Sequence, residues 1–363
     1  MAKLITQLEE KGLAHPPVWL ANNCHYLTQM GSVAYGCSTD KSDFDLYGFA
    51  IPPKYMVFPH LAGAVRGFGK EPDNFSQWQE HHVFDPEALG GKGREYDFAV
   101  YGIVNYFNLL MQNNANVIDS IFTPLDCVIH CTSLGQIVRD NRRAFLHKGC
   151  WHRYRGYAHS QLHKMSIKEH KGLPELQDFE RLHKISKDVT FQQVEKLYKK
   201  RDVEHKDAEI DHLTDSQLEE YYLLFSYMMK KGKRGELVKR FGIDTKFQSH
   251  VVRLLLQVEQ VMEEGELDLR RNSELLKSIR RGEWTEEQTK EYFSKKEKEL
   301  ETLYANSVLP WGPDEDKIKA LLLNCLEAHY GSLDNCIVTE DAAVKALREI
   351  AEVIDRNRKV LGA

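Results

Sequence analysis

The feature that most constrains the fold is a change of pattern along the chain, from mixed strand and helix to helix alone. From about Trp151 onward, apolar residues recur every three or four positions, which is typical of amphipathic helices. Before that point, residues 43–51 and 96–101 are short β-rich runs, and residues 104–111 have helical spacing. The pattern predicts an α/β (α+β) head with a short mixed sheet, followed by a mostly α-helical body.

The chain has 363 residues, which is enough for two domains with separate cores. We predict a head domain over residues 1–145 and a helical domain over residues 146–363, with a charged insertion around 168–240. Residues 54–94 are rich in Gly, Pro and His and have little periodicity. We expect this segment to be a long connection with only short elements.

The net charge of −5 gives no global field that would attract nucleic acid. Residues 151–256, however, carry 21 Lys+Arg against 16 Asp+Glu and half of the histidines. A basic face in this segment could contact phosphates. The alternative is an ordinary solvated helical surface with interspersed charges.

The expected compartment is the cytoplasm, without membrane contact. No apolar run approaches the length of a membrane span, and residues 1–10 are polar and amphipathic rather than signal-like. The seven cysteines are an odd number without a Cys-x-x-Cys pair, which is typical of reduced thiols in a cytosol.

Two short segments point to chemistry when they are taken together. Asp43 and Asp45 alternate along a predicted strand, so both project to one side. Two adjacent carboxylates repel each other and need a cation or a proton, and an oxygen-only ligand set suits Mg²⁺. Upstream, Gly31 and Ser32 offer backbone N–H groups and a hydroxyl to a phosphate. The combination predicts phosphoryl or nucleotidyl transfer, whereas a hairpin with surface aspartates is the alternative.

This arrangement resembles the signature of the DNA polymerase beta-like nucleotidyltransferase superfamily, and within it the branch associated with RNA ligases and RNA repair. The resemblance spans most of residues 20–290, although the segment around 168–240 matches nothing in it. Ala115 and Asp119 depart from the usual Pro and Glu of the family. The matching stretches are 31–36, 42–45, 52–53, 97, 114–119, 122–124, 156–161, 246–255 and 265–267.

The resemblance implies that Gly31 and Ser32 contact the triphosphate and that Asp43 and Asp45 bind the catalytic metal ions. A third acid on a neighbouring strand would complete the cluster. We choose Asp97, which opens the run 96–101 and directly precedes a predicted helix. Glu95 lies on the same face two residues earlier and is the rival, and Glu80 is a weaker candidate.

A second group of candidates lies on one predicted helix. Lys246, His250 and Arg253 are spaced by four and then three residues, so they share a helix face that suits a triphosphate or an RNA backbone. The alternative is a solvated face, but the resemblance favours the active cleft. Two further stripes could line a channel for the acceptor: Arg155, His159 and His163, and beside them Tyr157, Gln161 and Lys164.

The sequence therefore predicts a metal-dependent nucleotidyltransferase that moves NMP from an NTP to an acceptor hydroxyl. Mg²⁺ is the expected cofactor, with Mn²⁺ as a substitute. The resemblance implies an RNA end, with tRNA as one candidate, as the acceptor in RNA repair or processing. The alternatives are nucleotidylation of a protein or small molecule, and a non-catalytic module that binds nucleotide or RNA.

Overall fold

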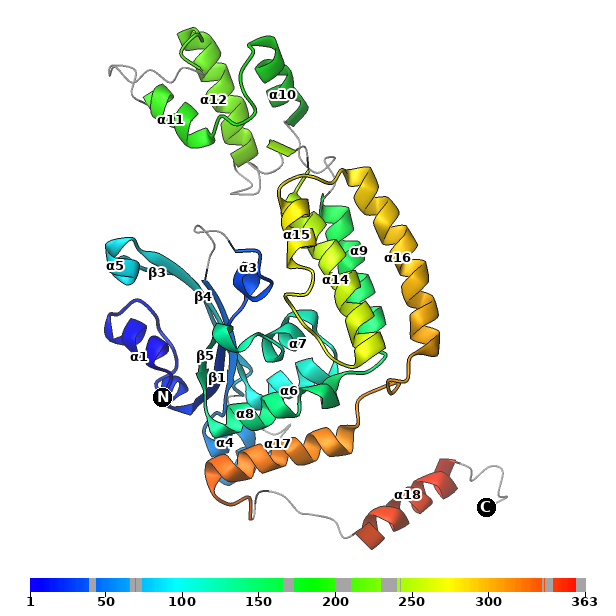
Figure 1. The fold of residues 1–363 in the computed structure, drawn as a ribbon. Helices are drawn as coiled ribbons and strands as arrows, with labels where there is room; N and C mark the ends of the chain where they lie inside the picture. The colour runs from blue at the N-terminus through cyan, green and yellow to red at the C-terminus, as the bar shows by residue number, and fades with distance from the viewer. Residues whose placement is uncertain are drawn as a thin grey trace.

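The computed structural model describes residues 1–38, 44–65, 69, 74–165, 173–199, 210–229, 240–241, 243–334, 336 and 342–356. Its first third is an α/β head built on a five-stranded mixed sheet, and the remainder is helical, which confirms the predicted fold class (Figure 1). The strands are β1 (Cys24–Gln29), β2 (Phe44–Ala50), β3 (Gln77–Asp85), β4 (Arg94–Gly102) and β5 (Val128–Cys131).

The strand order is β3-β4-β2-β1-β5. β2 and β4 are parallel neighbours, and the other three pairings are antiparallel. The short helices of the head are α1 (Lys3–Glu10), α2 (Leu20–Asn23), α3 (Gly31–Ala34), α4 (Lys54–Val57), η1 (Pro59–Ala62), α5 (Ala88–Gly91), α6 (Ile103–Met111), α7 (Ala115–Ile121), η2 (Leu125–Cys127), α8 (Ser133–Asp140) and η3 (Arg142–Phe145).

The expectation for residues 54–94 was wrong in one respect, because this segment contains the nine-residue strand β3. A register shift between Glu80 and Val83 interrupts its pairing with β4. Such a β-bulge shifts the two-residue alternation by one position, so the sequence shows no continuous strand pattern there. The bulge also changes which side chains of β3 reach the face of β4.

The two faces of the sheet are covered differently. On one face, α1 packs its Ile5 and Leu8 against a cluster that includes Leu46 of β2 and Phe98 of β4. The other face carries Phe49 and belongs to a larger core that continues through α6, α7 and α8 into the helical body. Figure 1 shows α1 on one side of the sheet and these three helices on the other. The body therefore packs on the sheet face that carries Asp45, since residues 45, 47 and 49 point to one side.

The helical body is built around three long helices, in which α14 packs against both α9 and α16 (Figure 1). The insertion has its own small core among α10, α11 and α12, with Phe179, Tyr221 and Phe225 buried in it. The helices are α9 (Cys150–Met165), α10 (Leu173–Leu182), α11 (Phe191–Lys199), α12 (Asp215–Met229), α14 (Thr245–Glu264), α15 (Ser273–Arg280), α16 (Glu286–Asn306), α17 (Glu315–Tyr330) and α18 (Ala342–Arg356).

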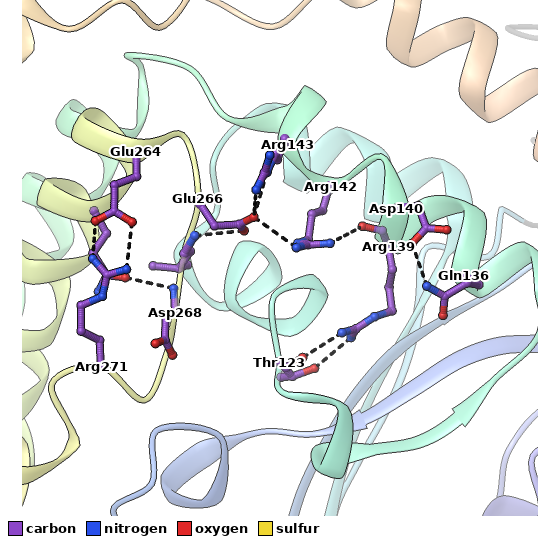
Figure 2. Close-up of polar contacts among 12 residues, drawn as sticks. Thr123, Gln136, Arg139, Asp140, Arg142, Arg143, Glu264, Glu266, Asp268 and Arg271 are labelled. Atoms are coloured by element: carbon purple, nitrogen blue, oxygen red, sulfur yellow. Dashed lines mark hydrogen bonds and ion pairs between the residues drawn. The ribbon is translucent and has the colours of Figure 1, made fainter.

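Polar contacts add to the apolar packing between head and body. In Figure 2, Arg142 and Arg143 of η3 converge on Glu266, just after α14. Arg143 Nε donates to Glu266 Oε2 at 2.8 Å, and Arg142 Nη2 donates to the same oxygen at 3.2 Å. Arg139 is buried and donates to the carbonyl of Thr123 at 2.9 Å. A cavity lies beside these residues, but their guanidinium groups are already bonded to protein partners.

Helix α17 docks on the head through a pair of histidines. His25 of β1 contacts Thr132 through Nδ1 at 2.9 Å and His329 of α17 through Nε2 at 3.0 Å. Burial lowers the pKa of His25 to about 4, and the neighbouring His329 and His130 lower it further. His25 is therefore neutral in the folded protein at pH 5, whereas in the unfolded chain it is mostly protonated.

We expect acid to destabilise this docking. Between pH 6.5 and about 4 the unfolded chain binds a proton that folded His25 does not, so the free energy of unfolding falls as the pH falls through this window. The loss at pH 5 should be about 2 kcal/mol. Urea unfolding at pH 7.5 and pH 5 measures it, with His25→Gln as the control. An equal pH dependence in the variant and the wild type would contradict the assignment.

Candidate functional site

The turn that begins α3 at Gly31, called here the Gly31 turn, packs directly against the carboxylate of Asp45. β1 ends at Gln29, and the backbone N–H of Met30 donates to the carbonyl of Asp45 at 2.7 Å. Gly31 has a φ of +66°, and a Cβ on it would lie 2.0 Å from Asp45 Oδ2. Only glycine fits here, because the backbone is left-handed and the Asp45 carboxylate occupies the place of a side chain. The turn that begins α3 and the carboxylate on β2 thus form one local unit.

The second carboxylate lies beside the first. Asp45 of β2 and Asp97 of β4 are partners in the parallel pairing, and residues in register on parallel strands project to the same face. Both side chains are half-buried. Asp43 lies outside the described residues, which leave out 39–43. The structure therefore brings together two of the three predicted carboxylates and tests nothing about the third.

Tyr47 continues the same face of β2, two residues after Asp45. Burial raises the pKa of Tyr47, and the nearby Tyr101 hydroxyl and Asp45 carboxylate raise it further. Its phenol is therefore a neutral hydrogen-bonding group beside the carboxylates rather than a charged one. Tyr157 of α9 also raises the pKa of this phenol, so α9 lies near Tyr47.

The bulge of β3 brings two histidines to the far side of Asp97. The backbone N–H of His82 donates to Asp97 Oδ1 at 2.8 Å, and His81 Nδ1 lies 3.5 Å from the same oxygen. The ring of His82 contacts the carboxylate of Glu95. Glu80 does not join this group, because it accepts from the backbone N–H of His15 at 2.8 Å and pairs with the ring of His15. Asp97 and Glu95 thus share one face, and Asp97 is the nearer to Asp45.

The body presents α14 to the Gly31 turn, but its three candidates do not share one role. Lys246 is exposed in the first turn of the helix, where Asp244 caps the backbone N–H of Lys246 at 2.9 Å. His250, one turn later, is half-buried. Arg253 is only 4% exposed, so it differs from the expectation of a donor that faces the cleft.

Arg253 is bound by groups of the protein itself. Its Nη1 donates to Asp119 Oδ2 at 2.6 Å, and its guanidinium lies 3.9 Å from the ring centroid of Tyr35. The hydroxyl of Tyr35 donates to the same carboxylate oxygen at 2.6 Å, and Gln257 donates to the other at 3.0 Å. Since Tyr35 directly follows α3, this buried cluster attaches the body to the Gly31 turn. Asp119, which replaces the family's usual Glu, lies at its centre.

Two further arginines, which the sequence analysis missed, contact the same turn from the body. Arg270 Nη2 donates to the carbonyl of Val33 at 3.4 Å while its Nη1 pairs with Asp126 at 2.8 Å. Arg280, the last residue of α15, donates through Nη1 to the carbonyl of Cys37 at 3.2 Å. In the sequence both resemble ordinary surface arginines, and only the tertiary structure places them at α3.

Arg280 differs from the other cations around the turn. It is half-buried, and within the described part of the chain it pairs with no carboxylate; its other contact is Ser249 Oγ at 3.4 Å. Burial lowers the pKa of Arg280 from its usual value, and the like charge of Arg253 lowers it further. A guanidinium in this position gains from an anion, because no acid among the described residues balances its charge.

The two predicted stripes of side chains on α9 contact different parts of the structure. Arg155 and His159 both contact Glu297 of α16, at 2.5 Å and 3.2 Å, so they face that helix. Tyr157 lies near Tyr47 instead, since it contributes to the raised pKa of that phenol. Gln161 is buried, and the side chain of Lys164 lies outside the described residues.

Comparison with known proteins shows the family to which the chain belongs. Residues 18–311 match the profile of the RNA repair pathway DNA polymerase beta family. The chain belongs to this family. The match confirms the resemblance seen in the sequence and indicates nucleotidyltransferase chemistry. No curated protein and no solved structure is significantly similar to the chain. Among the described helices, none is long and apolar enough to cross a membrane.

Proposed function

We propose that this protein is a metal-dependent nucleotidyltransferase that moves NMP from an NTP to the hydroxyl at an RNA end. The observation that carries the proposal is the register of Asp45 with Asp97, directly beside the glycine that opens α3. Two half-buried carboxylates on one face repel each other, and a cation between them would relieve this repulsion. A turn suited to binding phosphate lies next to them, and Mg²⁺ commonly binds carboxylates and phosphates together.

The donor set fits a hard divalent cation. Asp45 and Asp97 offer oxygen ligands only, and Asp43 is proposed to join them. These residues would hold Mg²⁺, or Mn²⁺ in its place. Bound there, the metal would neutralise charge on the phosphates and lower the pKa of the acceptor hydroxyl.

The residues of the chain would then position the reactants. Gly31 and Ser32 would bind the triphosphate through backbone N–H groups and the Ser32 hydroxyl, with Lys246 and His250 approaching from α14. The acceptor oxygen attacks the α-phosphorus, the bond from that phosphorus to the bridging oxygen breaks, and pyrophosphate leaves. Asp97 would accept the proton of the acceptor hydroxyl. Arg253 would act indirectly, by holding Tyr35 and the turn in place.

RNA is the acceptor that we favour. The family is described by its place in RNA repair, and residues 151–256 carry an excess of basic residues. A tRNA end is one acceptor of this kind. Nucleotidylation of a protein or small molecule is the second candidate. An enzyme with such an acceptor would need no extended basic surface. We also propose a division into a catalytic domain, 1–145, and a helical domain, 146–363, which share a continuous core.

A transfer assay tests the proposal. Purified protein, Mg²⁺ and each α-labelled NTP are incubated with a pool of tRNA and other RNA, and in parallel without RNA. We expect label at RNA 3′ ends. Label on protein or on small molecules alone would support the second candidate. Measurable binding of NTP or RNA without any transfer would instead indicate a binding module.

The charge of Arg280, which no acid in the described part of the chain balances, leads to a separate prediction. We expect Arg280→Gln to weaken NTP binding roughly 10- to 100-fold and to leave NMP binding unchanged, because a charge-assisted hydrogen bond to the β- or γ-phosphate is lost. Isothermal titration with both ligands measures the difference. Arg281→Gln is the matched control, since Arg281 is adjacent, exposed and paired with Glu283 at 2.6 Å. Equal weakening of NTP and NMP, or the same effect in the control, would contradict the assignment.

A further inference from the structure

The bulge of β3 holds an unusual backbone conformation beside the carboxylates. His82 has a φ of +58°, which is uncommon for a residue other than glycine. The register shift between Glu80 and Val83 places it opposite the part of β4 that carries Glu95 and Asp97. Its imidazole contacts Glu95, and its backbone N–H donates to Asp97 Oδ1. The bulge therefore brings an imidazole nitrogen beside Glu95 and Asp97, which offer only oxygen ligands.

The three side chains have the spacing of a metal site. One ligand atom of each, the imidazole nitrogen of His82 and a carboxylate oxygen of Glu95 and of Asp97, lies within 4.8 Å of the other two. Three atoms spaced evenly around one ion with metal–ligand bonds of about 2.0–2.2 Å lie roughly 3–4 Å apart, so small side-chain rotations would let a single ion contact all three. The set consists of one imidazole and two carboxylates, and it is open to solvent on its outer side.

The negative charge of this face also favours a bound cation. Glu95 and Asp97 form no ion pair with a lysine or arginine among the residues that the structure describes, and their charged contacts are with His82 and His81. Asp45, in register with Asp97, adds a third carboxylate to the same face. Because like charges this close repel each other, a bound cation would stabilise the arrangement.

We propose that His82, Glu95 and Asp97 form a second cation site, specific for a divalent transition-metal ion such as Mn²⁺. It lies across β4 from Asp45 and shares Asp97 with the carboxylates proposed for nucleotidyl transfer. A carboxylate has two oxygens and can bridge two ions. The metal binding itself is independent of the proposed function, whereas an effect on transfer rests on it.

The nitrogen ligand decides which ion is preferred. Mg²⁺ favours an all-oxygen shell and keeps most of its waters, so an imidazole adds little to its affinity. Imidazole together with carboxylate suits Mn²⁺ and the later divalent ions of the first transition row. The site should therefore bind Mn²⁺ in preference to Mg²⁺, unlike an all-carboxylate site. Its open positions would let water or a phosphate oxygen complete the shell.

The test is Mn²⁺ binding to the purified full chain without nucleotide, followed by electron paramagnetic resonance. We expect one bound Mn²⁺ to show coupling to a histidine nitrogen in the electron spin-echo modulation. His82→Asn should abolish this coupling and weaken that Mn²⁺ at least about tenfold. Asparagine is chosen because it tolerates the left-handed backbone that His82 adopts. Glu95→Gln should weaken the same ion by a similar factor.

The matched control is His15→Asn, another exposed histidine that contacts a glutamate of β3. It should leave the nitrogen coupling and the affinity unchanged. Nitrogen coupling that persists in His82→Asn, or an unaltered Mn²⁺ affinity in that variant, would overturn the proposal.

Asp45→Asn separates this inference from the proposed function. If both are right, that variant loses transfer and keeps the histidine-coupled Mn²⁺. Loss of transfer in Asp45→Asn, with no histidine-coupled Mn²⁺ in any protein, would overturn the second site alone. Normal transfer in Asp45→Asn, with the coupling intact, would overturn the function alone.

Discussion

Replacing Asp45 with Asn is expected to lower the rate of nucleotidyl transfer by on the order of 10³-fold or more. The substitution keeps the size and shape of the side chain, and therefore its contact with Gly31. It removes the negative charge that would hold the metal beside Asp97. Circular dichroism and the thermal midpoint should stay close to the wild type, so the loss is one of chemistry and not of folding.

Companion variants identify the third carboxylate. We expect Asp97→Asn to match the loss in Asp45→Asn, because the two residues are in register. Glu80→Gln should transfer at nearly the wild-type rate, since Glu80 is bonded to His15. A loss in Glu95→Gln as large as in Asp45→Asn, with Asp97→Asn active, would assign the role to Glu95 instead. Retention of transfer in Asp45→Asn to within tenfold of the wild type would contradict the catalytic role of Asp45.

The largest effect on stability is expected at the buried cluster. Asp119→Asn leaves the guanidinium of Arg253 buried without its counter-charge, which costs about 3–5 kcal/mol in free energy of unfolding. Urea denaturation measures this cost. The double variant Asp119→Leu with Arg253→Met should recover much of it, because two apolar side chains need no charge balance.

An exposed ion pair provides the comparison. Glu264 and Arg271 also form a salt bridge, but both are solvent-exposed, so Glu264→Gln should change stability little. Asp119→Asn should in addition lower transfer, because Tyr35 donates to Asp119 and directly follows the phosphate turn. Wild-type stability in Asp119→Asn would show that the cluster does not join the body to the head.

The parts that the sequence predicted well have regular local patterns. β2 and β4 are continuous β-rich runs, and α6 has clear helical spacing. The predictions of Asp45 and Asp97 depended on these two strands, and parallel pairing then set their register. α14 and α17 each begin directly after a capping aspartate, Asp244 or Asp314.

The parts that it missed depend on contacts between distant segments. β3 was hidden because its bulge breaks the alternation, and His82 was missed with it. Arg253 shares a helix face with Lys246 and His250, but its partner Asp119 lies 134 residues away in the chain. No local pattern distinguishes such a buried cation from one that faces a cleft. Arg280 was missed because a basic residue at the end of a helix is commonplace.

The central claim is tested most directly by following both ends of the triphosphate in one reaction. ATP, or whichever NTP supports transfer, is supplied with separate labels on the α- and γ-phosphates, together with Mg²⁺ and RNA. Nucleotidyl transfer predicts one α-label at an RNA 3′ end for each γ-label released as pyrophosphate, with both lost in Asp45→Asn. Transfer of the γ-label to RNA, or release of γ-label as inorganic phosphate with no α-label incorporated, would contradict it.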